Sequence, residues 1–189
     1  CNVVLGGIER QLMDAAVTPT TQTNRNIDCC NQNPQDARMS EGASLPLDVT
    51  VTTDVNDTTS TTPDSLRAAL SALGESKNIV LIMGGADKNL DMQPALKQLP
   101  LYASTVILLS GEGTSGTEKI KKDVYALPDL HVIEVGSIDE ALKQAFFYAR
   151  NNERILFSPG FASFGMFKNE FDRGEKFMVA VKRLKSETK

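Results

Sequence analysis

Three residues that suit anion binding, Thr61, Lys88 and Ser163, each follow a run that is predicted to be a strand. A lysine ammonium and two hydroxyls together can bind a carboxylate or a phosphate, because all three donate hydrogen bonds and one is charged. Nucleophilic catalysis is not indicated, because no general base accompanies the serine in the sequence. The carboxyl ends of parallel strands meet at one edge of a sheet, where ligands commonly bind. We therefore expect the three side chains to converge there.

The stretch around Ser163 is predicted to be a strand, a turn and the start of a helix. Residues 155–157 form a short apolar run typical of a buried parallel strand, and a Ser-Pro-Gly turn follows. Phe164, Phe167 and Phe171 then recur at the spacing of one helix face, which makes Ser163 the predicted N-cap. The free backbone N–H groups at such a helix start attract anions. The alternative is a capped helix that packs on the sheet and binds nothing.

Lys88 lies in a glycine loop, and Thr61 lies in a run of polar residues. The paired glycines that open the segment Gly84–Asp91 permit a sharp turn and a close approach to a ligand. The run 56–62, NDTTSTT, ends at Thr62, the predicted cap of a helix, and it holds more polar side chains than capping requires. The alternative for Lys88 is a solvated loop lysine.

The segments that must position these residues alternate between strands and helices. Strands are predicted at residues 78–83, 105–109, 132–135 and 155–157, with a further one at 47–54. Helical spacing of apolar residues predicts helices between them, and a last helix is expected after Gly174. This alternation indicates βαβ units. We therefore expect an α/β, Rossmann-like fold in which helices cover both faces of a mostly parallel sheet.

The composition of the 189-residue chain is globular and excludes several function classes. A net charge of −4 without a long basic run argues against nucleic-acid binding. No stretch approaches the roughly 18 apolar residues of a membrane span. No secretory leader is readable, and the three cysteines form neither a disulfide framework nor a zinc site, so a cytoplasmic protein is expected. His131, the only histidine, is expected within a strand.

Nucleotide-binding motifs are missing from the sequence. The phosphate loop GxxxxGK followed by Ser or Thr does not occur, and GEGTSG at residues 111–116 lacks the spacing of a dinucleotide-binding GxGxxG. We therefore expect a substrate-binding half-site without its own nucleotide cradle, with no metal ligands.

Residues 1–46 differ in composition from the rest of the chain. Residues 18–42 are rich in Thr, Asn, Gln, Asp and Ser and bury too little apolar surface to offset their ordering entropy. We expect 1–46 to be an irregular segment or the remnant of a preceding domain, and 47–189 to be the α/β domain.

Three blocks of sequence together resemble the C-terminal domain of the Mur ligases. They occur in the order and spacing of that family and span residues 55–185, and the third block is the most specific. The most similar members are those that add D-glutamate in peptidoglycan synthesis. The blocks are NDTTSTTPDSLRAAL at 56–70, IMGGADKNLD at 82–91 and LFSPGFASFGMFKNEFDRGEKF at 156–177.

This resemblance implies part of an ATP-dependent ligase that joins D-glutamate to a UDP-sugar peptide through an acyl phosphate. The C-terminal domain of such a ligase binds the amino acid and closes over a central domain that holds ATP and Mg. It carries no catalytic residue of its own. The resemblance assigns substrate-binding roles to Thr61, Lys88, Ser163 and Phe164, and places Asn56 and Asp57 toward the nucleotide.

Two positions differ from the family pattern. Thr59 stands where a lysine is common, and Glu170 where an aromatic residue often lines the amino-acid site. Two hypotheses follow, a piece of a ligase that is inactive without its other domains, or a free-standing, non-catalytic binding domain of the same fold. Retention of Lys88 and Ser163 favours the first, because a scaffold has no reason to keep them.

Overall fold

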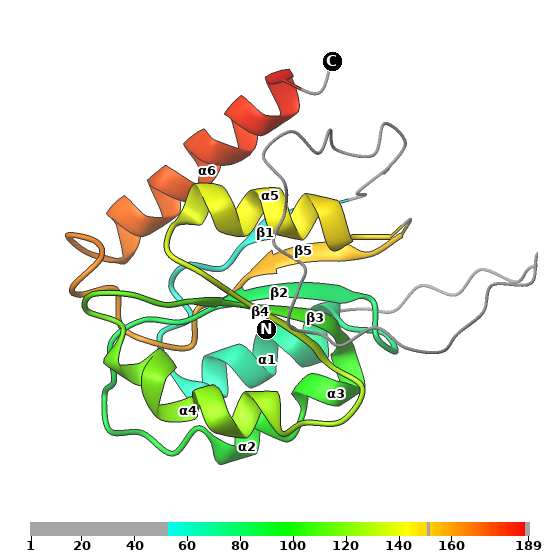
Figure 1. The fold of residues 1–189 in the computed structure, drawn as a ribbon, viewed down its shortest axis with the longest axis vertical. Coiled ribbons are helices and arrows are strands. Elements are labelled where there is room, and N and C mark those ends of the chain that lie inside the picture. Colours follow the sequence, from blue (N-terminus) through cyan, green and yellow to red (C-terminus); the bar gives the residue numbers. More distant parts are fainter. Residues whose placement is uncertain (1–52, 151, 188–189) are drawn as a thin grey trace, which may run out of the picture. The chain divides into compact units, whose positions relative to one another are not determined.

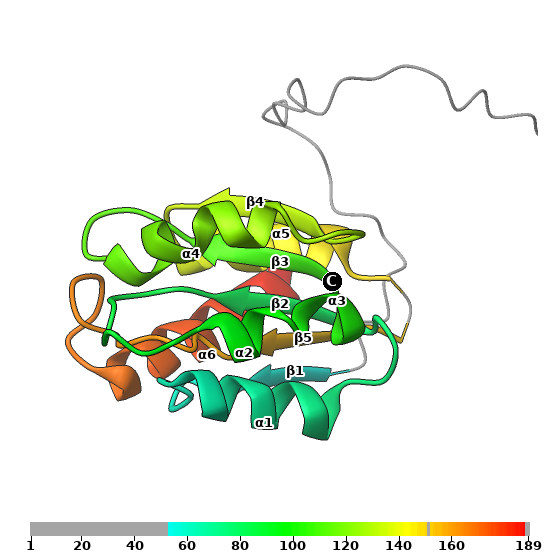
Figure 2. The same ribbon diagram turned by 90° about the horizontal axis from the view of Figure 1, so that it is seen from below.

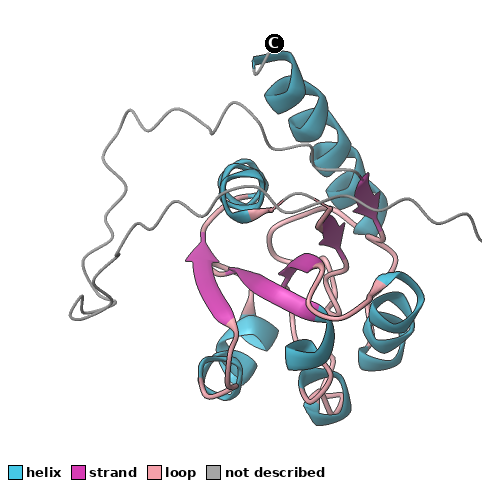
Figure 3. Cartoon of the chain, turned by 90° about the vertical axis from the view of Figure 1, so that its right-hand side faces the viewer, coloured by secondary structure: helices cyan, strands magenta, loops and turns pink. Residues whose placement is uncertain are grey.

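A parallel five-stranded sheet lies between two layers of helices in the part of the chain that the computed structural model describes, residues 53–150 and 152–187 (Figures 1 and 3). The α/β fold expected from the sequence is confirmed. The predictions for residues 1–46, and for residues 47–52 of the first strand, lie outside the described residues. Among the described helices, none is long and apolar enough to cross a membrane.

The strands follow the order β1-β5-β2-β3-β4 across the sheet, as Figure 2 shows. All four pairings are parallel. Phe157 at the end of β5 lies opposite both Asn56 of β1 and Ile82 of β2, so these three strands end close to one level. The strands are β1 (Thr53–Asn56), β2 (Ile79–Met83), β3 (Ala103–Leu109), β4 (His131–Val135) and β5 (Arg154–Phe157).

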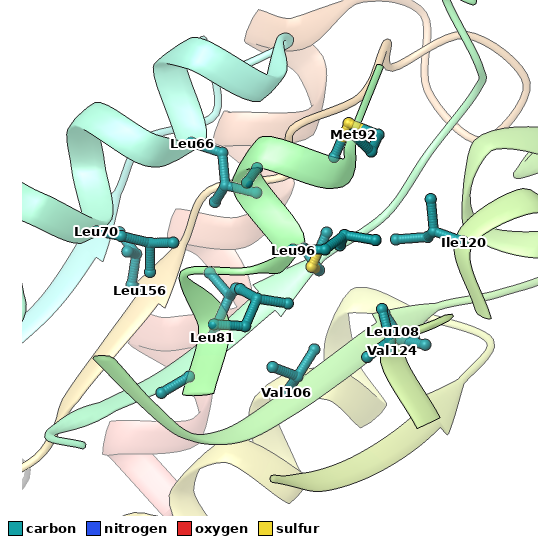
Figure 4. Close-up of a cluster of buried hydrophobic side chains, with 14 of the residues drawn as sticks. Leu66, Leu70, Leu81, Met92, Leu96, Val106, Leu108, Ile120, Val124 and Leu156 are labelled. Atoms are coloured by element: carbon teal, nitrogen blue, oxygen red, sulfur yellow. The ribbon is translucent and has the colours of Figure 1, made fainter. Parts of the chain in front are cut away.

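Helices cover the two faces of the sheet unequally. One face carries α1 (Pro63–Leu73), α2 (Gln93–Leu96), α3 (Leu99–Tyr102) and α4 (Ser115–Tyr125) over the buried cluster shown in Figure 4. The other carries α5 (Ile138–Tyr148) and α6 (Glu170–Glu187) over a second cluster. In that cluster the ring of Phe157 stacks on Phe177 with centroids 4.6 Å apart. Because both faces are buried, every residue of β2 is apolar.

The start of α1 follows the sequence prediction. Thr62 is the N-cap, and its hydroxyl accepts a hydrogen bond from the backbone N–H of Ser65 at 3.2 Å. The hydroxyl of Ser65 in turn accepts from the backbone N–H of Thr62 at 3.1 Å, which completes a capping box. Pro63 follows as the first helical residue, where its missing N–H costs nothing. These contacts fix the end of the loop that carries Thr61.

The predicted helix start at Ser163 is wrong. Residues 158–169 form an irregular loop with turns and an isolated bridge at Ala162, and α6 begins only at Glu170. Gly165 has a φ of +99°, which a right-handed helix does not permit. Phe164 and Phe171 are 65% and 70% exposed, so their spacing does not mark a buried helix face.

The last helix begins earlier than predicted, because Gly174, which was expected to precede it, lies within α6. A Cβ at this position would lie 2.6 Å from the side chain of Thr58 and 3.3 Å from that of Asn56. Close packing of α6 on the β1–α1 loop therefore explains the glycine, rather than a helix boundary.

Candidate functional site

Lys88 and Thr61 contact each other at the carboxyl edge of the sheet. The ammonium of Lys88 donates a hydrogen bond to the hydroxyl of Thr61 at 2.8 Å. Lys88 is exposed and Thr61 is half-buried. The predicted convergence of these two residues, 27 positions apart, is confirmed.

The loop that carries Ser163 lies beside the Lys88 loop. Ala86 and Ala162 form an antiparallel bridge, in which Ala86 N–H donates to Ala162 O at 2.9 Å and Ala162 N–H donates to Ala86 O at 3.1 Å. Ser163 follows directly and is only 3% exposed. The structure therefore brings the three predicted loops to one edge, where Lys88 is exposed and Ser163 is buried.

Phe164 lies on the exposed side of the same edge. Its side chain is 65% exposed, and those of Leu90 and Phe171 are 41% and 70% exposed. Phe164, which directly follows Ser163, therefore presents an exposed apolar ring that a ligand or another domain can cover.

Asn56 and Asp57 are anchored to the end of β5 and to α6. The amide of Asn56 donates to Gly174 O at 3.3 Å, and the carboxylate of Asp57 accepts from the hydroxyl of Ser158 at 2.9 Å. Burial raises the pKa of the Asp57 carboxyl, while the hydroxyls of Ser158 and Ser60 oppose this effect. The carboxyl of Asp57 is therefore half-buried and fixed by the hydrogen bond from Ser158, close in sequence to Thr61.

Arg173 joins two of the site loops from within α6. It is fully buried, and its guanidinium donates to the hydroxyl of Thr58 at 3.1 Å, to Thr58 O at 2.6 Å and to Phe161 O at 3.1 Å. Burial lowers its pKa to about 10, so the group stays charged at neutral pH. No carboxylate lies within ion-pair distance of it among the described residues. We call Arg173 and Gly174 the α6 clamp.

The Lys88 loop is held from the other face by α4. The hydroxyl of Ser115 accepts from Asp87 N–H at 3.1 Å, and Lys119 pairs with the Asp87 carboxylate at 2.8 Å. This lysine lowers the pKa of the Asp87 carboxyl. Sequence reasoning predicted the helix α4 from its apolar face but missed the contacts that α4 and α6 make to these loops. We call Ser115, Thr117 and Lys119 the α4 clamp.

A groove of about 600 Å³ lies between α5 and α6, and Met166 and Phe167 of the loop after Ser163 line one side of it. Its charged side chains pair with one another, Arg183 with Asp139 and Lys176 with Asp172. We place the candidate site at the loop edge instead, because the anion-binding groups gather there. Among the described residues no group of three or more His, Cys, Asp and Glu side chains is arranged to hold a metal.

Comparisons with known proteins show which family the chain resembles. Residues 48–161 match the family described as Mur ligase, glutamate ligase domain. The chain is 38% identical over 130 residues to the UDP-N-acetylmuramoylalanine–D-glutamate ligase of Roseiflexus sp. (strain RS-1), covering 67% of this chain and 27% of that protein. It is also 38% identical over 133 residues to the ligase of the same name from Treponema pallidum (strain Nichols), covering 67% and 23%.

The chain spans about a quarter of the length of these curated relatives. A crystal structure of a domain from Haemophilus ducreyi 35000HP, described as a UDP-N-acetylmuramate:L-alanyl-gamma-D-glutamyl-medo-diaminopimelate ligase, also aligns with it. That alignment has a TM-score of 0.41 and 15% identity, and covers 70% of this chain and 94% of that one.

Proposed function

Because the chain belongs to the Mur ligase family, as a glutamate ligase domain, we propose that it is the C-terminal, amino-acid-binding part of a UDP-N-acetylmuramoylalanine–D-glutamate ligase. The carrying observation is the hydrogen bond from Lys88 to Thr61 beside the loop of Ser163. In this role the unit binds D-glutamate and presents its amine to the UDP-sugar peptide.

The chemistry of the edge suits a dicarboxylate. Lys88 donates to a neutral hydroxyl in this structure. A carboxylate is a better acceptor for an ammonium, and such charge-assisted bonds are about twice as strong as neutral ones. Thr61, Ser163 and the backbone at Phe164 then supply the remaining donors. D-glutamate therefore meets one cation and several neutral donors, while the exposed ring of Phe164 lies beside it.

ATP and Mg are assigned mostly to a central domain outside this unit. The chain has no phosphate loop, and Thr59 stands where the family often has a lysine. ATP supplies the phosphoryl group that activates the acid. Asn56 and Asp57 face that nucleotide across the closed domains, with Asp57 held by Ser158. The proposed partners are D-glutamate, a UDP-sugar peptide, ATP and the other ligase domains in the cytoplasm.

A titration of the purified, ¹⁵N-labelled chain tests the proposal. We expect D-glutamate to shift the backbone amide signals of Thr61, Lys88 and Ser163 more than L-glutamate does. Absence of any shift at these three loops at tens of millimolar D-glutamate would remove the proposed site. We also expect the chain alone to release no ADP from ATP, and steady turnover by it with all substrates would contradict the assignment of ATP to another domain.

Lys88→Ala sharpens that titration. Loss of a charged hydrogen bond costs about 1.5–3 kcal/mol, so the Kd for D-glutamate should rise about tenfold or more. Lys143→Ala is the matched control, since Lys143 is an exposed lysine of α5 on the other face of the sheet. Equal Kd values for the Lys88→Ala and wild-type chains would exclude Lys88 from the site.

The alternative is a free-standing, non-catalytic binding domain of the same fold. The short span of the chain relative to its relatives favours a piece of a larger ligase. A fusion separates the two hypotheses: residues 53–189 replace the matching part of the Roseiflexus ligase. D-glutamate-dependent ADP release by the fusion supports the ligase, and binding without ADP release supports the binding domain.

A further inference from the structure

Thr117 is a fully buried side chain beneath the glycine loop that leads to Lys88. Its hydroxyl donates a hydrogen bond to Leu109 O at the end of β3, at 2.8 Å. The same hydroxyl accepts a hydrogen bond from Gly85 N–H at 3.0 Å. One buried oxygen therefore connects β3, α4 and the Gly84–Gly85 turn.

The turn itself has little intrinsic rigidity. Gly84 and Gly85 have φ values of +131° and +151°, a region that glycine enters freely and other residues rarely adopt. Neighbouring segments restrain it instead. Gly84 N–H donates to Pro159 O at 3.0 Å, and Gly85 O accepts from Gly116 N–H at 3.0 Å and from Thr117 N–H at 3.3 Å in α4. A Cβ on Gly84 would lie 2.7 Å from the Thr117 hydroxyl. The turn is therefore shaped around this threonine.

The restraint extends along the backbone to Lys88. Asp87 N–H donates to the hydroxyl of Ser115, and its carboxylate accepts from Asn89 N–H at 2.9 Å. Residues on both sides of Lys88 are thus held, while its exposed side chain reaches Thr61.

We propose that Thr117 is a positioning residue that sets the place of the Lys88 ammonium through the Gly84–Gly85 turn. A valine at 117 keeps the shape but removes both hydroxyl bonds, which leaves a buried N–H and a buried C=O without this partner. The turn must then move to find other partners. The consequence for D-glutamate rests on the proposed function, whereas the consequence for Lys88 itself does not.

The first test observes the Lys88–Thr61 contact without any ligand. In the full chain, a nuclear Overhauser effect is expected between the Lys88 ε-methylene and the Thr61 methyl group. Thr117→Val should abolish it and Thr117→Ser should restore it, because serine keeps the hydroxyl. Thr105→Val is the control, a buried threonine of β3 away from the loop. Retention of the contact in Thr117→Val would overturn the proposal.

The second test uses D-glutamate and a double-mutant cycle. Thr117→Val should raise the Kd about fivefold or more alone, and should add nothing in the Lys88→Ala background, because it acts through Lys88. The same fold-change in both backgrounds would overturn the proposal. If the wild-type chain binds no D-glutamate, the proposed function fails, and the Lys88–Thr61 contact still decides the role of Thr117.

Wild-type hydrogen exchange keeps the inference testable if Thr117→Val does not fold. The Gly85 amide donates to a buried hydroxyl, so it should exchange as slowly as the amides of β2. Fast exchange at Gly85 with slow exchange in β2 would show that the turn opens freely, which the proposal forbids.

Discussion

The α6 clamp and the α4 clamp hold the same edge of the sheet from opposite faces by different means. On one face, Arg173 places a buried guanidinium between the β1–α1 loop and the β5–α6 loop. On the other, α4 uses the hydroxyls of Ser115 and Thr117 and an exposed ion pair from Lys119. The first joins two loops to each other, and the second fixes a single glycine loop.

This difference indicates that the α6 clamp mainly stabilises the fold, whereas the α4 clamp mainly positions the loop of Lys88. The buried guanidinium of Arg173 is costly to remove, because two backbone carbonyls and one hydroxyl accept hydrogen bonds from it. Loss of the neutral hydroxyl contacts of the α4 clamp costs less free energy of unfolding. These contacts nevertheless help to fix the position of the flexible glycine loop that carries Lys88. We therefore expect changes in the α6 clamp to affect unfolding most, and changes in the α4 clamp to affect the position of Lys88 most.

Replacing Arg173 by Met should have the largest effect on stability. The change removes three hydrogen bonds and leaves buried acceptors at Thr58 and Phe161, so we expect a loss of about 3 kcal/mol in the free energy of unfolding. Urea denaturation measures it. Arg183→Met on the same helix is the control, since its pair with Asp139 is half-exposed. Equal losses in the two variants would remove the distinction between the clamps.

Replacing Gly174 of α6 or Gly116 of α4 by alanine should lower stability to a similar extent. Gly174→Ala places a Cβ 2.6 Å from Thr58, and Gly116→Ala places one 2.4 Å from the Phe161 ring. Each should cost about 2 kcal/mol by overpacking, although alanine favours helices by about 1 kcal/mol. Thermal unfolding measures both. Gly136→Ala has open space around its Cβ and serves as the control. A stabilising Gly174→Ala would mean that α6 is not tightly packed on the loop.

The pH dependence of stability tests the carboxyl beside the α6 clamp. Burial raises the pKa of Asp57, so its contribution is full below the unfolded pKa and is lost as pH rises through the folded pKa. Asp57→Asn should therefore become more stable relative to wild type as the pH rises above the unfolded pKa of about 4. Glu112→Gln is an exposed control. If Asp57→Asn instead became less stable relative to wild type as the pH rises, the hydrogen bond from Ser158 would outweigh the effect of burial on the pKa of Asp57.

The exposed pair of the α4 clamp should have the smallest effect. Lys119→Met removes the partner of Asp87, and pairs of this kind contribute about 0.2–1 kcal/mol. We expect a loss below about 0.5 kcal/mol that shrinks further at high salt. Urea denaturation at low and high salt measures it. A loss as large as that of Arg173→Met would make the two clamps equivalent.

Sequence reasoning located the edge but not what holds it. Local patterns predicted the strands and the cap at Thr62, and parallel topology then predicted that Thr61, Lys88 and Ser163 meet. The role of Arg173 depends on backbone carbonyls far away in sequence, which no local pattern reveals. The spacing of Phe164, Phe167 and Phe171 suggested a helix that starts at Ser163. This prediction failed because side-chain spacing carries no information on the positive φ of Gly165.

The hydrogen bond from Asn56 to Gly174 joins residues 118 positions apart. During synthesis Asn56 leaves the ribosomal exit tunnel before Gly174 has been added to the chain. The nascent chain therefore carries its β1–α1 loop without α6, the helix that holds this loop. Contacts at such a large sequence separation slow folding, because the entropy of closing the chain between the two residues is lost before the contact stabilises the fold. The β1–α1 loop should consequently reach its folded position only after α6 has left the exit tunnel.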